Sequence, residues 1–189
     1  GQHSFERYNS AFLLNAKGEV HDIYNKNLLL AFGEYIPILS SFEFFDFIMP
    51  PNFFFSAGDS PKSMELAGVR YGVSICYEAL MPRFIRQLMA DKPHILINLT
   101  NDAWFGDTHE PLLHLALASF RAVENRRFMV RSTNTGITAF ISPTGQILEP
   151  TQTYTKANRI MQVSALEDMT VYARFGDWLA YLCVFLLLF

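Results

Sequence analysis

The sequence predicts a layered α/β fold, with helices packed on a sheet, for residues 1–170. Three observations lead to this prediction. Apolar runs of strand length alternate with helical segments, glycine turns join several strands into hairpins, and half of the 189 residues are hydrophobic. Such an alternation is typical of a layered sandwich rather than of an all-β barrel. The length is sufficient for one domain with a sizeable core.

The chain opens with a predicted hairpin. Residues Tyr8–Asn15 and Val20–Tyr24 flank the segment Ala16–Glu19, in which Gly18 supplies the turn. Glycine and proline then punctuate the segment Phe32–Pro37, which we expect to be a loop.

The middle of the chain alternates between strand and helix. We expect a strand over Val69–Cys76, a helix over Met81–Ala90 and a strand over His94–Leu99. A longer helix starts near Asp107 or Thr108. Its apolar residues recur at helical spacing, which predicts that they form its buried face. These residues are Leu113, Ala116, Leu117, Phe120 and Val123.

Short strands complete the predicted sheet. They cover Phe128–Ser132, Ile137–Ile141, Gln146–Leu148 and Arg159–Val163, and the second and third are joined by a turn at Ser142–Gly145.

The end of the chain is an unbroken apolar run from Trp178 to Phe189. A membrane-spanning helix needs roughly 20 apolar residues, so this run is too short to span alone. It is either a buried helix or the start of a membrane helix over residues 177–189, and the lack of a polar face favours the second. Because Gly1 is not a start methionine, we expect a fragment of a longer membrane protein. With a net charge of −3 and no basic run, nucleic-acid binding is not expected.

Cys76 is the candidate nucleophile, because it ends an apolar strand and is followed at once by Tyr77 and Glu78. An isolated cysteine is more often a small core residue. Here Lys26 and Glu34 also lie beside predicted strand ends, although a lone lysine is usually a solvated charge. A thiol needs a nearby base or cation to react, and an ammonium can stabilise both the thiolate and an oxyanion.

Five segments, in order, resemble those of the apolipoprotein N-acyltransferases, which belong to the nitrilase (carbon-nitrogen hydrolase) superfamily. The resemblance runs from about Tyr8 to the end of the chain. The segments are YNKNLLLAFGEYIP (24–37), GVSICYE (72–78), NLTNDAWFGD (98–107), RSTNTGITA (131–139) and YARFGDW (172–178).

The resemblance implies part of a nitrilase-type α-β-β-α sandwich with a Glu-Lys-Cys triad. Cys76 is then the nucleophile, Lys26 the triad lysine and Glu34 a second acidic residue. The backbone N–H of Tyr77 is expected in the oxyanion hole, with Glu78 at a further site position. Trp104 and Phe105 line the acyl or substrate cleft or, equally well, pack in an aromatic core.

The implied reaction moves an acyl chain from a phospholipid, through a cysteine thioester, to the α-amino group of a diacylglyceryl-cysteine apolipoprotein. The resemblance also implies that the catalytic domain lies on the periplasmic side of the bacterial inner membrane. It implies that the enzyme uses neither a cofactor nor a metal. The alternatives are a nitrilase-superfamily amidase acting on small C–N bonds and a membrane-anchored binding module without catalysis. The apolar tail and the phenylalanine-rich stretch 42–55 argue against the amidase, and the Lys-Glu-Cys set argues against the binding module.

Two further features of the sequence bear on the function. Neither Glu6 nor Glu19 has the setting of the triad glutamate, so we expect that general base upstream of Gly1 and expect this fragment alone to be inactive. The phenylalanine-rich stretch 42–55 has no clear period. It is either a lid over the acyl chain or hydrophobic packing under neighbouring strands.

Overall fold

The computed structural model describes residues 6–37 and 54–188. The chain divides into two compact units, Gly1–Pro61 and Lys62–Phe189, and each is described by itself. The expected single domain over residues 1–170 stays a prediction. Most of the phenylalanine-rich stretch 42–55 lies outside the described residues, and both interpretations of it stay open.

The first unit contains the predicted hairpin. Strands β1 (Ser10–Leu14) and β2 (Val20–Asn25) pair antiparallel. Gly18 adopts φ +79° in the turn between them, a conformation that favours glycine, and its N–H donates to the carbonyl of Asn15. The segment Phe32–Pro37 is irregular, as expected for a loop.

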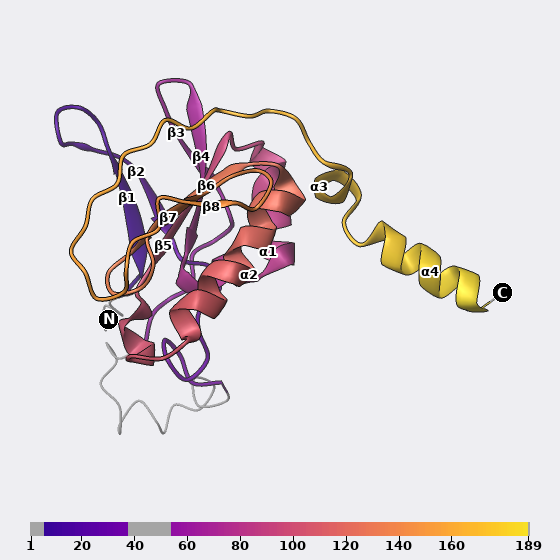
Figure 1. Ribbon diagram of the computed structural model, residues 1–189, viewed down its shortest axis with the longest axis horizontal. Coiled ribbons are helices and arrows are strands. Elements are labelled where there is room, and N and C mark those ends of the chain that lie inside the picture. Colours follow the sequence, from indigo (N-terminus) through magenta and orange to yellow (C-terminus); the bar gives the residue numbers. More distant parts are fainter. Residues whose placement is uncertain (1–5, 38–53, 189) are drawn as a thin grey trace, which may run out of the picture. The chain divides into compact units, whose positions relative to one another are not determined.

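The second unit is built on a six-stranded sheet in the order β3-β4-β5-β6-β7-β8 (Figure 1). The three central strands β4, β5 and β6 are parallel, and the outer pairings are antiparallel. The strands are β3 (Ser63–Leu66), β4 (Val69–Ile75), β5 (Ile95–Thr100), β6 (Phe128–Thr133), β7 (Ala139–Ile141) and β8 (Ile147–Leu148).

Helices connect the parallel strands, as the crossover between parallel neighbours requires. Helix α1 (Pro82–Leu88) joins β4 to β5, and α2 (Glu110–Asn125) joins β5 to β6. The two helices lie side by side next to the sheet (Figure 1). The core of this unit is formed by residues that they and the sheet bury, among them Val73, Ile85, Leu88, Leu96, Leu115, Met129 and Ile141. The mixed α/β class predicted from the sequence is confirmed.

The predicted buried face of α2 is wrong. Leu113, Ala116, Leu117, Phe120 and Val123 are all exposed, Phe120 to 56%. The helix instead buries one leucine, Leu115, together with small and polar residues. These are Ala118, Ala122, His114, Arg121 and Asn125. Small side chains let the helix approach its neighbours closely, and the buried polar ones find partners, as Arg121 does with Glu124 at 2.6 Å.

One predicted strand is absent, and one observed strand was not predicted. The segment Arg159–Val163 is not a strand. None of its residues is buried, and Ile160 is 96% exposed. Strand β3 was not predicted at all. It pairs with β4 through a tight turn at Ala67 and Gly68, both with positive φ. Such a turn usually carries asparagine or aspartate at its first position, and alanine gives no such signal.

The second unit ends in two short helices, α3 (Val171–Phe175) and α4 (Trp178–Leu188). The side chain of Thr170 caps α3 by accepting from the N–H of Ala173. Every residue of α4 is exposed, so the buried-helix interpretation of this segment is not supported. Among the described residues, no helix has both the length and the apolar character needed to cross a membrane.

Candidate active site

Cys76 lies where β4 gives way to a turn of 3-10 helix, η3 (Cys76–Leu80). Its φ of +53° is in the left-handed region, which is strained for a residue with a side chain. The residue is half-buried and free of any disulfide. A cysteine held in this way at a strand end has the placement that a nucleophile needs, because the strand fixes its backbone while the residue stays only half-buried.

The two residues that follow Cys76 occupy the same turn. Tyr77 is half-buried, whereas Glu78 is completely buried. Glu78 Oε2 accepts a hydrogen bond of 2.7 Å from the backbone N–H of Ile75. The carboxylate therefore ties η3 back onto the end of β4, on the two sides of Cys76. One role of Glu78 is therefore to stabilise the conformation of the turn that contains Cys76.

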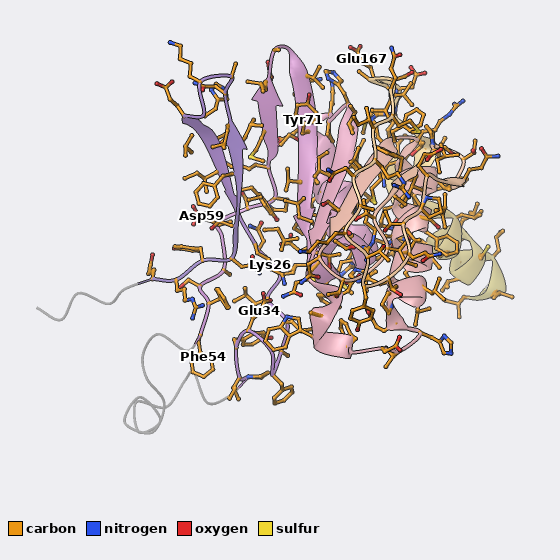
Figure 2. All side chains as sticks on the ribbon, turned by 60° about the vertical axis from the view of Figure 1, so that its left-hand side comes forward. Lys26, Glu34, Phe54, Asp59, Tyr71 and Glu167 are labelled. Atoms are coloured by element: carbon orange, nitrogen blue, oxygen red, sulfur yellow. The ribbon has the colours of Figure 1, made fainter. Side chains whose placement is uncertain are left out.

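Lys26 and Glu34 form an ion pair within the first unit. Lys26 Nζ lies 2.6 Å from Glu34 Oε2, and Lys26 is almost completely buried (Figure 2). The carboxylate also accepts from the N–H of Leu30 at 2.8 Å and from Asn9 Nδ2 at 3.0 Å. Burial on its own raises the pKa of Glu34, but these hydrogen bonds and the charge of Lys26 outweigh it and lower the pKa. Glu34 is therefore held as a carboxylate.

The predicted site residues thus form two groups, one in each unit. Lys26 and Glu34 are in contact with each other, and Cys76, Tyr77 and Glu78 share one turn. That the two groups join in one active site stays a prediction.

The aromatic residues Trp104 and Phe105 belong to η5 (Asp102–Phe105), which follows β5. Trp104 is 77% exposed and Phe105 39% exposed. They are therefore not part of an aromatic core of the second unit. Lining of a substrate cleft stays a prediction for both.

A set of buried polar residues that the sequence analysis did not single out lies on the central strands. Asn98 on β5 and Arg131 on β6 are completely buried, and Arg131 Nη1 donates to Asn98 Oδ1. Arg131 Nη2 donates to Asp102 Oδ2 at 3.0 Å, and His114 Nδ1 lies 3.1 Å from Asp102 Oδ1. Burial raises the pKa of Asp102, but the hydrogen bond with His114 and the charge of Arg131 outweigh it and lower the pKa.

Asp102, Glu110 and His114 also have the atoms to bind a metal ion, because their potential ligand atoms lie within 4.8 Å of one another. However, Asp102 Oδ2 already binds the guanidinium of Arg131. A metal ion at this position would be repelled by that buried positive charge. The arrangement is better described as an ion-pair network, in which burial raises the pKa of Glu110.

Comparison with known proteins supports the resemblance found in the sequence. Residues 1–169 match the model of the carbon-nitrogen hydrolase family. A protein of Bdellovibrio bacteriovorus named apolipoprotein N-acyltransferase is 38% identical over 90% of this chain and 32% of its own length. Its namesake in Geobacter metallireducens is 36% identical over 93% of this chain and 34% of its own length. The chain thus spans about a third of the length of these curated relatives.

Solved structures of this superfamily share the fold. An amidase from Nesterenkonia sp. aligns with a TM-score of 0.56 at 21% identity, over 76% of this chain and 51% of the amidase. A carbon-nitrogen hydrolase from Helicobacter pylori G27 aligns with a TM-score of 0.58 at 15% identity, over 79% of this chain and 54% of the hydrolase. These likenesses show the fold alone. The match over residues 1–169 shows that the chain belongs to the carbon-nitrogen hydrolase family.

Proposed function

We propose that this chain carries the nucleophile of an apolipoprotein N-acyltransferase, with Cys76 accepting a fatty acyl chain from a phospholipid. The observation that carries the proposal is Cys76 itself, held at φ +53° at the carboxyl end of a central parallel strand. The relatives of that name, at 36–38% identity over nine-tenths of the chain, supply the reaction class.

The reaction has two displacement steps. In the first, the Cys76 thiolate attacks the ester carbonyl carbon of the phospholipid, a C–S bond forms and the ester C–O bond breaks. The lysophospholipid leaves as an alcohol and takes up a proton. In the second, the α-amine of a diacylglyceryl-cysteine lipoprotein attacks the thioester, a C–N bond forms and the C–S bond breaks. The proton lost by the amine returns the sulfur to the thiol.

The other predicted residues have roles in the same steps. The buried ammonium of Lys26, paired with Glu34, stabilises the oxyanion of each tetrahedral intermediate together with the N–H of Tyr77. Trp104 and Phe105 line the path of the acyl chain. This assignment requires that the Lys26–Glu34 pair and Cys76 meet in the assembled site.

The proposal extends to fold and location. The six-stranded sheet with α1 and α2 supplies one sheet and one helical layer of an α-β-β-α sandwich that covers residues 1–170. Residues 177–189 begin a membrane helix. The catalytic domain faces the periplasm at the inner membrane, where both the phospholipid and the lipoprotein acceptor are available.

Acyl-enzyme trapping tests the proposal. The full-length protein, not this chain alone, is incubated in detergent with phosphatidylethanolamine of one defined acyl chain, without acceptor. It is then analysed by mass spectrometry of the intact protein. We expect an adduct of that acyl mass which neutral hydroxylamine removes and which a diacylglyceryl-cysteine peptide consumes. The adduct should be absent in Cys76→Ala and present in Cys183→Ala, which removes the cysteine of α4.

The rival amidase function predicts a different result. Release of ammonia from small aliphatic amides, dependent on Cys76 and without any lipid adduct, would replace the acyltransferase by the amidase. An adduct that persists in Cys76→Ala would show that Cys76 is not the nucleophile.

A further inference from the structure

A row of buried polar side chains crosses the sheet beneath Cys76. Ser74 on β4 is in register with Asn98 on β5, which is in register with Arg131 on β6. Residues in register on neighbouring strands project from the same face of the sheet. Each of the three is at most 1% exposed. Three polar residues in line on three central strands are unusual, because such strands normally carry apolar residues on both faces.

The hydrogen-bonding capacity of these groups fixes the orientation of the Asn98 amide. A guanidinium can only donate, so the oxygen of Asn98 must face Arg131, whose Nη1 donates to it. The nitrogen of the amide is then turned toward β4. There Asn98 Nδ2 is 3.4 Å from the carbonyl oxygen of Cys76, 3.4 Å from that of Ser74 and 3.3 Å from Ser74 Oγ.

Arg131 is held in turn by a carboxylate. Its Nη2 donates to Asp102 Oδ2, and neither side chain has any exposed surface. Asp102 Oδ1 accepts from Thr100 Oγ1 at 3.1 Å, and His114 Nδ1 lies at the same distance from that oxygen. Burying a guanidinium costs free energy unless the charge is paired. At this position Asp102 supplies the paired charge for Arg131.

We propose that Asn98 and Arg131 are positioning residues for the nucleophile. Asn98 holds the carbonyl of Cys76, Arg131 fixes the orientation of Asn98, and Asp102 fixes Arg131. The inference rests on the proposed role of Cys76 as the nucleophile. It explains how a cysteine with a left-handed backbone is retained at the strand end. The turn is held through Cys76 O by Asn98 and through Ile75 N by Glu78.

The electrostatics are consistent with this arrangement. Burial lowers the pKa of Arg131, while the charge and hydrogen bond of Asp102, and then the charge of a Cys76 thiolate, oppose the shift.

The chain contains a matched control for Arg131. Arg127 is also completely buried, but it donates to backbone carbonyls, those of Pro93 at 2.6 Å and Asp168 at 2.6 Å among them. Replacing either arginine by lysine keeps the positive charge but removes the planar guanidinium, whose several N–H groups can donate to two acceptors at once. Arg131→Lys and Arg127→Lys thus make the same chemical change in two buried settings.

The experiment compares Asn98→Leu, Arg131→Lys and Arg127→Lys in the full-length protein, not in this chain alone. Thermal unfolding is followed to establish that each variant is folded. We expect Asn98→Leu and Arg131→Lys to lower kcat for thioester formation by about 10²-fold, a loss that a displacement of about 1 Å can cause. KM for phospholipid should stay unchanged. We expect Arg127→Lys to lower the unfolding temperature and leave kcat unchanged.

A second readout does not depend on the acyl donor. The rate constant for alkylation of Cys76 by iodoacetamide, measured by mass spectrometry, should fall in Asn98→Leu and Arg131→Lys but not in Arg127→Lys. If acyl transfer is absent from the wild type and alkylation follows this pattern, the proposed function fails and the positioning role stands. Equal losses in all three variants, an effect on KM alone, or unchanged kcat and alkylation in Asn98→Leu would overturn the positioning role.

Discussion

Gly136 lies directly against the carboxylate of Asp102. A Cβ at residue 136 would overlap Asp102 Oδ2 and stand 3.0 Å from the Cβ of Asp102. The same oxygen receives the 3.0 Å hydrogen bond from Arg131. Because Gly136 has no side chain, it leaves room for the Asp102 carboxylate to pair with Arg131.

Gly136→Ala should consequently separate that buried pair. Because breaking a buried ion pair leaves an uncompensated charge, we expect the free energy of unfolding to fall by about 3–5 kcal/mol, measured by urea denaturation. Gly68→Ala is the control. It has open space around its Cβ but a φ of +77°, so it should cost only about 1–2 kcal/mol of backbone strain. Similar losses in both variants would contradict the steric argument.

The position of Cys76 was predictable from the sequence, because an apolar run of strand length ends there. The row of Ser74, Asn98 and Arg131 was not. In the sequence the three residues lie far apart, in three different strands. Only the order and register of β4, β5 and β6 bring them together. Local patterns determine where strands lie, but not which residues of distant strands become neighbours.

The orientation of α2 was missed for a related reason. Apolar periodicity identifies a face but not what that face contacts. His114 is buried because Asp102, which lies outside α2, binds it. Arg121 pairs with Glu124, three residues further along the same helix, so its burial does not require a partner on another element. The hydrophobic stripe that was predicted to be core is left on the surface.

Two leucines of α2 test its orientation. Leu115 is 3% exposed and Leu117 is 40% exposed. We expect Leu115→Ala to reduce the free energy of unfolding by about 2–5 kcal/mol, as for a core leucine. Leu117→Ala should change it by no more than about 0.5 kcal/mol. Urea denaturation of both variants gives the answer, and the reverse ranking would support the face predicted from periodicity.

We expect Glu78 to stabilise the fold mainly by accepting a hydrogen bond from the backbone N–H of Ile75, and less by its negative charge. Glu78→Ala leaves the buried N–H of Ile75 without the 2.7 Å bond to Oε2, which we expect to cost about 1–3 kcal/mol of stability. Glu78→Gln keeps an oxygen that can accept this bond, so it should retain most of the stability. The two variants are compared by thermal unfolding. Equal losses would show that the negative charge of Glu78 is what matters.

Trp104 offers a test of the proposed acyl path. Because its side chain is 77% exposed, Trp104→Ala should not change the unfolding temperature measurably. If the indole contacts the acyl chain, KM for phospholipid should rise, since apolar contact area is lost equally in the ground and transition states. Phospholipid titration of thioester formation measures KM. An unchanged KM would remove Trp104 from the substrate path.

The Lys26–Glu34 pair predicts a pH dependence of stability. The pKa of Glu34 is lowered from 4.5 in the folded state, so the folded state binds fewer protons than the unfolded state in this range. The contribution of the pair is then complete above about pH 4.5, the unfolded-state value, and is lost as the pH falls through the folded-state pKa. In Lys26→Met the pKa of Glu34 should rise, because the first hydrogen-bond donor and the neighbouring positive charge are both removed.

We therefore expect Lys26→Met to be less stable than the wild type at neutral pH, and the difference to shrink as the pH falls below about 4.5. Urea denaturation over a pH series measures the difference, and ¹³C NMR of the glutamate carboxyl groups follows Glu34 directly. Lys17→Met, at an exposed lysine in the β1–β2 turn, is the control and should show no such dependence. A stability difference in Lys26→Met that stays constant through acid pH would mean that Lys26 stabilises the fold by packing its aliphatic chain. Glu34 would then owe its lowered pKa to Leu30 and Asn9.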